Sequence, residues 1–178
     1  MSANGLEVFD RTLETTHIWL NEICDDLGPD KQVAWKVLST VLHKLRDRLT
    51  INLAAHFGAQ LPLLVRGVYY DQFEPGKMPN ASRSREDFVA EVAEWLSDTR
   101  PVNPEEAIRS VFRLLSRHIS EGQVNKVRDA LPKSLRQMWE SAEDPTVKAG
   151  ERRQDDGRAE SSPPRADEPL ILTEGQVV

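Results

Sequence analysis

Apolar residues recur every three or four positions through about the first 140 residues of this 178-residue chain, which is the period of an amphipathic α-helix. The first helical face comprises Val8, Phe9, Leu13, Thr16, Leu20 and Ile23. The sequence Leu27-Gly28-Pro29-Asp30 predicts the end of this helix and the start of the next. We therefore expect an all-α fold.

The next stretch predicts the most strongly amphipathic helix of the chain. Its apolar stripe comprises Val33, Val37, Leu38, Val41, Leu42, Leu45 and Leu49, and its opposite face carries Lys36, His43, Arg46 and Asp47. A short helix through Leu53, Ala54 and Phe57 follows, with Gly58 as its predicted stop. Pro62 then predicts the first turn of another helix, because the missing N–H of proline is best tolerated there.

The second half of the chain follows a similar plan. Ser82 or Ser84 is the expected N-cap of a helix that bears Phe88, Val92, Trp95 and Leu96. Asn103 and Pro104 begin another helix, with a stripe of Ala107, Val111, Leu114, Leu115 and Ile119. Gly122 is the predicted end of that helix, and Val124 and Val127 lead into the last one.

One pattern occurs twice: Leu-Pro, three positions, Arg, two positions, aromatic. It places Arg66 and Tyr69 in the first half, and Arg136 and Trp139 follow at a constant step of 70. The same step aligns the two central apolar stripes, whereas a step of 76 aligns Trp19 with Trp95. The pattern favours two tandem homologous helical units that pack as one compact domain.

The predicted boundaries follow from these elements and from a change in composition. We expect a helical domain over residues 1–142, with repeat one at about 6–73, a linker at 74–83 and repeat two at about 84–142. Residues 143–178 are rich in charged residues, Ser, Pro and Gly, which predicts a disordered tail. Its last ten residues, 169–178, turn apolar again and are either a floppy end or a tethered docking peptide.

Charge and cysteine content bear on the class of binding partner and on the cellular compartment. The net charge of −6 argues against nucleic-acid binding, and a modest basic face is the alternative. That face would comprise Arg83, Arg85, Lys126, Arg128, Lys133 and Arg136. The single cysteine, Cys24, fits a reducing compartment, and neither a signal peptide nor a membrane span is expected. We expect a cytoplasmic protein.

Candidate catalytic and metal-binding groups are sparse. Glu14 and His17 lie on one helical face, but a di-iron site needs a second Glu-x-x-His pair, which the chain lacks. The neighbours Asp25 and Asp26 would raise the pKa of the Cys24 thiol, the wrong direction for a nucleophile. Neither a nucleophile elbow nor a glycine-rich phosphate loop is present. We therefore expect no cofactor, no metal site and no enzyme.

The residues most open to a binding role are those of the repeated pattern, namely Arg66, Tyr69, Tyr70, Arg136 and Trp139. Each arginine is either an internal clamp for carbonyl or carboxylate groups or a fork for an anionic ligand. The aromatic residues are either core anchors or the walls of a groove. Adjacent Tyr69 and Tyr70 cannot face the same side of a helix, so we expect one of them to be partly exposed.

Part of the chain resembles a bacterial family of unknown function. The runs LRDRL at 45–49, AAHFGAQLPLLVRGVYYD at 54–71 and LPKSLRQMW at 131–139 are similar to the domain of unknown function 2267 family. The resemblance covers residues 6–142 approximately, with Glu140 where the family pattern suggests proline. It implies an all-helical bacterial protein, found in stress-related gene settings, and carries no established activity.

Two functions remain open from the sequence. The first is a non-enzymatic interaction or scaffold module with an unknown protein partner. The second is a small-molecule or cofactor-binding helical protein, with a pocket between the two halves near Arg66 and Arg136.

Overall fold

The computed structural model describes residues 5–144, and every regular element in this range is helical, which confirms the expected all-α class. The predicted tail, apart from residues 143 and 144, lies outside the described residues. The elements in chain order are α1 (Glu7–Leu27), α2 (Lys31–Arg46), α3 (Ile51–Ala59), α4 (Leu63–Tyr70), the 3-10 helix η1 (Pro75–Lys77), α5 (Arg85–Trp95), α6 (Pro104–His118), α7 (Glu121–Ala130) and α8 (Lys133–Glu143).

Side-chain caps begin the helices at the predicted positions. The Asp30 carboxylate accepts the backbone N–H groups of Gln32 and Val33, and Asn103 does the same for the first turn of α6. The Ser84 hydroxyl, rather than that of Ser82, accepts the N–H of Asp87 at the start of α5. These bonds satisfy donors that the helix itself leaves unpaired.

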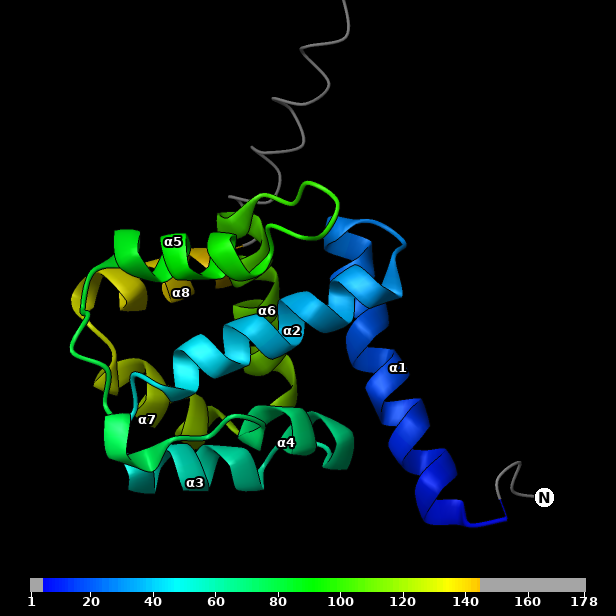
Figure 1. Cartoon of the computed structure of the whole chain (residues 1–178). Coiled ribbons are helices and arrows are strands. Elements are labelled where there is room, and N and C mark those ends of the chain that lie inside the picture. The colour runs from blue at the N-terminus through cyan, green and yellow to red at the C-terminus, as the bar shows by residue number, and fades with distance from the viewer. Residues whose placement is uncertain (1–4, 145–178) are drawn as a thin grey trace, which may run out of the picture. The chain divides into compact units, whose positions relative to one another are not determined.

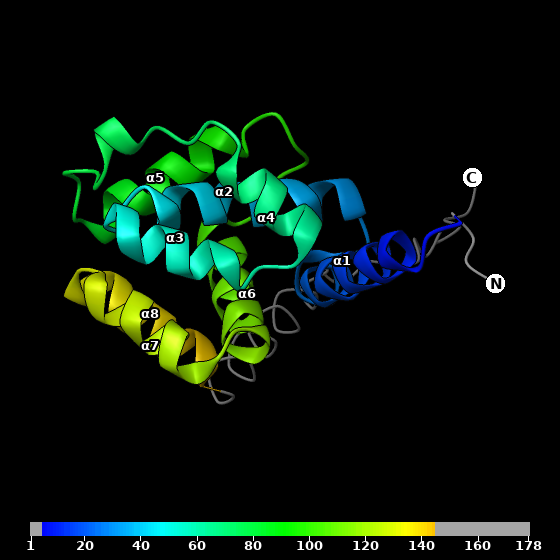
Figure 2. The same cartoon turned by 90° about the horizontal axis from the view of Figure 1, so that it is seen from below.

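Helices α2 and α6 pack against each other at the centre of the domain (Figure 1). Helix α2 also contacts α1, α4 and α5, and α6 contacts α1, α5, α7 and α8. The central pair therefore supplies most of the core, including Val37, Leu38, Val41, Val111 and Leu115, all fully buried. Viewed from below, α3 and α4 lie on one side of this pair and α7 and α8 on another (Figure 2).

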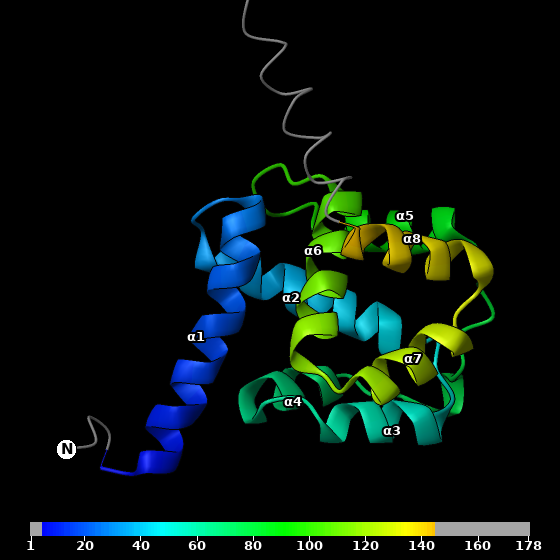
Figure 3. The ribbon, with the colours of Figure 1, turned by 180° about the vertical axis from the view of Figure 1, so that it is seen from behind.

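The first turns of α1 extend away from the other helices (Figures 1 and 3). Phe9 and Leu13, which belong to the predicted helical face, are 51% and 42% exposed, whereas Leu20 and Ile23 are buried. The helix itself is confirmed, but only its second half packs on the core. No helix among residues 5–144 has the length and apolarity that a membrane crossing needs.

Two predicted glycine stops are wrong. Gly58 lies inside α3 and is buried against the next helix. Gly122 lies in the first turn of α7, and α6 has already ended at His118. Neither α3 nor α6 ends on a glycine in the left-handed conformation. The C-cap residue of α3 is Gln60, in right-handed helical backbone, and Pro62 follows at the N-cap of α4, whereas α6 ends because Ile119 adopts extended backbone.

Three further residues, on α2 and α5, differ from their predicted environments. His43 and Arg46, which we expected on the polar face of α2, are 6% and 2% exposed. Trp95, which we expected in the apolar stripe of α5, is 39% exposed. His43 and Arg46 are buried because α4 and the segment after it cover that face of α2 with backbone carbonyl groups.

Candidate functional site

The two arginines of the repeated pattern bind carbonyl groups of their own half. Arg66 donates from Nε to the oxygen of Gly58 at 3.1 Å, and from Nη2 to Ala59 at 2.8 Å and Leu61 at 3.0 Å. Arg136 donates from Nη2 to Asp129 at 3.0 Å and Leu131 at 3.5 Å. Each guanidinium therefore satisfies carbonyls that the end of the preceding helix leaves unpaired.

The aromatic residues of the pattern lie mainly in the core. Tyr69 and Trp139 are fully buried, and Trp139 stacks on Phe112 at a centroid distance of 4.2 Å. The Tyr69 hydroxyl donates to the Ala54 carbonyl at 2.8 Å. Tyr70 is half-buried beside it, so one tyrosine of the pair is partly exposed, as predicted.

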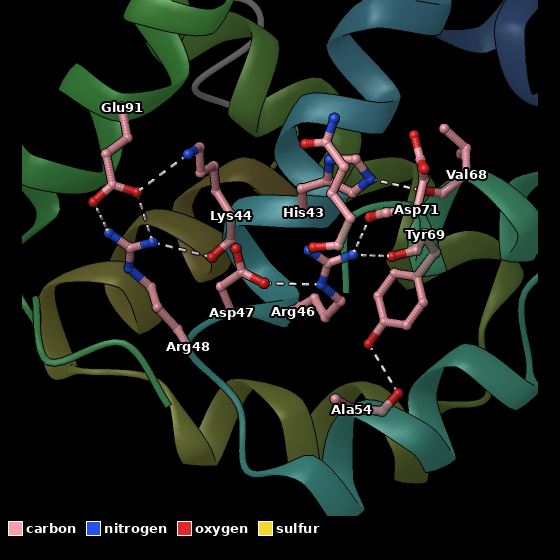
Figure 4. A network of polar contacts seen from close by, with 11 residues as sticks. His43, Lys44, Arg46, Asp47, Arg48, Ala54, Val68, Tyr69, Asp71 and Glu91 are labelled. Carbon is pink, nitrogen blue, oxygen red and sulfur yellow. Dashed lines mark hydrogen bonds and ion pairs between the residues drawn. The ribbon is translucent and has the colours of Figure 1, made fainter. Parts of the chain in front are cut away.

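A buried arginine that the sequence pattern did not single out organises the end of α4 (Figure 4). Arg46 donates to the carbonyls of Tyr69, Asp71 and Gln72, and its Nε contacts the Asp47 carboxylate at 2.8 Å. This one side chain thus fixes the path of the chain out of α4.

A second buried cation joins α2 to α5. Arg48, just after α2, donates to both carboxylate oxygens of Glu91, at 3.0 and 3.2 Å, and its guanidinium lies over Phe88 at 4.7 Å. Lys44 lies 3.8 Å from the same carboxylate and 4.6 Å from the centre of the Trp95 ring. In the sequence, both buried arginines lie in the run 45–49, directly beside the apolar stripe, and this position is the feature that could have indicated their burial.

His43 completes the network on the same face of α2 (Figure 4). Its Nε2 lies 2.5 Å from the Val68 carbonyl, which can only accept, so this nitrogen carries the proton. Burial lowers the pKa of His43, while the bond to Val68 acts in the opposite direction. The imidazole is therefore held neutral, as a structural donor.

A polar surface pocket of about 290 Å³ lies next to this network. Asp47 and residues of the segment after α4, from Gln72 to Asn80, line it. The Asp47 carboxylate is bound by Arg46, and its backbone carbonyl accepts the N–H of Asn80 at 2.6 Å. Neither Arg66 nor Arg136 lines this pocket.

The described residues contain no group of three metal-ligating side chains. Glu14 and His17 are both exposed on α1. Burial raises the pKa of the Cys24 thiol, the opposite direction from that of a thiolate nucleophile.

Large apolar side chains are exposed at the start of α1. Leu6, Phe9 and Leu13, called the α1 stripe here, are 53%, 51% and 42% exposed. Phe9 and Leu13 share one side of α1, and Leu6 is the N-cap residue that directly precedes the helix. Helix α4 packs against α1 and begins with two further exposed leucines, Leu63 at 55% and Leu64 at 41%. The start of α4 is the end nearest α1 (Figures 1 and 3).

No curated protein matches the chain. A family described as an uncharacterized conserved protein, DUF2267, matches residues 16–138, a range that includes both arginine clamps and the buried network and begins after the α1 stripe. The chain belongs to this DUF2267 family.

Proposed function

We propose that the protein is a non-enzymatic interaction module that binds an apolar surface of a partner through the α1 stripe. The observation that carries this proposal is the exposure of three large apolar side chains, at the N-cap and in the first two turns of a helix whose second half packs on the core. Contiguous apolar surface of this kind marks interaction sites in proteins. We place the binding in the bacterial cytoplasm, the setting that the family resemblance and the lone Cys24 favour.

The bonds of the arginine clamps and of the buried network support this choice. Arg46, Arg48, Arg66 and Arg136 each bind carbonyl or carboxylate groups of the domain itself. An anionic ligand would have to displace those bonds before it could be bound. The α1 stripe needs no such rearrangement.

The test is capture of partners by the immobilised full chain from a bacterial lysate, read by quantitative mass spectrometry. Phe9→Ser removes the centre of the stripe, and Ile18→Ser, at a residue 46% exposed on the opposite side of α1, is the matched control. We expect wild type and Ile18→Ser to retain the same proteins and Phe9→Ser to lose them. Equal retention by all three would contradict the proposal, and a chain ending at residue 144 reports whether the tail contributes.

We infer as well that the domain consists of two tandem homologous units, at about 6–73 and 84–142. The two arginine clamps support this inference. Arg66 binds the carbonyls of Ala59 and Leu61, and Arg136 binds those of Asp129 and Leu131, which are the positions 70 residues later. The step of 76 pairs buried Trp19 with exposed Trp95, although it also pairs Leu20 with Leu96, which are both buried. A step of 69 pairs Trp19 with Phe88 and Ile23 with Val92, all buried.

A further inference from the structure

We draw no further inference here: the strongest candidate, the exposed apolar surface that the α1 stripe forms with Leu63 and Leu64 at the start of α4, is the surface already proposed for binding, and nothing in the described part of the chain, residues 5–144, shows what covers it.

Discussion

At the scale of single residues, Gly58 sets the approach of α3 to α4. A Cβ atom at this position would lie 2.5 Å from the Tyr70 hydroxyl oxygen and 2.8 Å from Cε1 of the Tyr69 ring. The Tyr69 ring cannot retreat, because it is fully buried and its hydroxyl binds the Ala54 carbonyl. We expect Gly58→Ala to lower the free energy of unfolding by about 1–3 kcal/mol, since overpacking exceeds the gain in helix propensity.

The matched control is Gly67→Ala. Gly67 lies inside α4, is exposed, and would have nothing within 4 Å of an added Cβ. We expect this change to raise the free energy of unfolding by up to about 1 kcal/mol, as helix propensity alone predicts. Urea denaturation of both variants measures the contrast, and a change of the same sign in both would refute the packing explanation.

His43 gives the domain a predicted pH dependence. Burial holds the pKa of His43 below its ordinary value in the folded state, while in the unfolded chain the imidazole titrates near its ordinary pKa of about 6.5. As the pH falls below the unfolded-state pKa, His43 binds a proton in the unfolded state but not in the folded state. The free energy of unfolding therefore decreases until the folded-state pKa is reached. Urea denaturation at several pH values between 7 and 5 measures this decrease.

Two histidine variants separate this contribution from other titrations. We expect His43→Gln to show a smaller loss of stability on acidification than wild type, because its amide does not titrate. His56→Gln, at an exposed position on α3, should keep the wild-type pH dependence. An unchanged slope in His43→Gln would assign the effect to other groups.

At the scale of elements, the sequence predicted which residues form helices better than it predicted what covers them. The caps at Asp30 and Asn103 are local features, because the side chain bonds to a backbone only two or three positions away. Periodicity defines a face of α1, but burial of that face depends on α4 and α6, which are distant in sequence. Phe9 and Leu20 therefore have the same pattern and opposite environments.

The same reasoning explains which part of the candidate site was missed. The repeated pattern identified Arg66 and Arg136, because a motif that occurs twice is visible in the sequence. Arg46 occurs once, and its partners are the carbonyls of Tyr69, Asp71 and Gln72, at least 23 positions away. Backbone carbonyls carry no side-chain identity, so the sequence contains no residue type that indicates these bonds.

Helix α4 and the segment after it should depend on Arg46. Arg46→Met keeps an unbranched apolar stem but removes the guanidinium donors, leaving the carbonyls around it unpaired. We expect a loss of about 2–4 kcal/mol in the free energy of unfolding, the range for removing buried charge-assisted bonds. Hydrogen exchange should show faster exchange at Asn80, whose N–H binds Asp47.

Arg48→Met is the control for location. Arg48 binds Glu91 on α5, so its loss should speed exchange in α5 more than at Asn80. Uniform acceleration in both variants would mean that each acts only through global stability. A selective effect of Arg46 would establish that the end of α4 is held by this residue.

At the scale of the whole molecule, the two predicted halves do not have separate cores. Helix α1 packs on α6 as well as α2, α2 packs on α5 and α6, and α3 packs on α7. Apolar residues such as Val37 and Leu42 are fully buried in the domain that both halves form. Each half should therefore need the other to exclude water from its apolar face.

The chain can be divided within η1, whose residues Pro75, Gly76 and Lys77 are all exposed. We expect fragments 1–76 and 77–178 to show little cooperative unfolding alone, because separation exposes the contact between α2 and α6. Mixing them should restore helical circular dichroism and a cooperative transition. A second fragment with Val111→Asp should fail to complement, since Val111 is fully buried on α6. If fragment 1–76 unfolded cooperatively by itself, the first half would be an independent domain. The shared core would then be an interface between the first half and the second half.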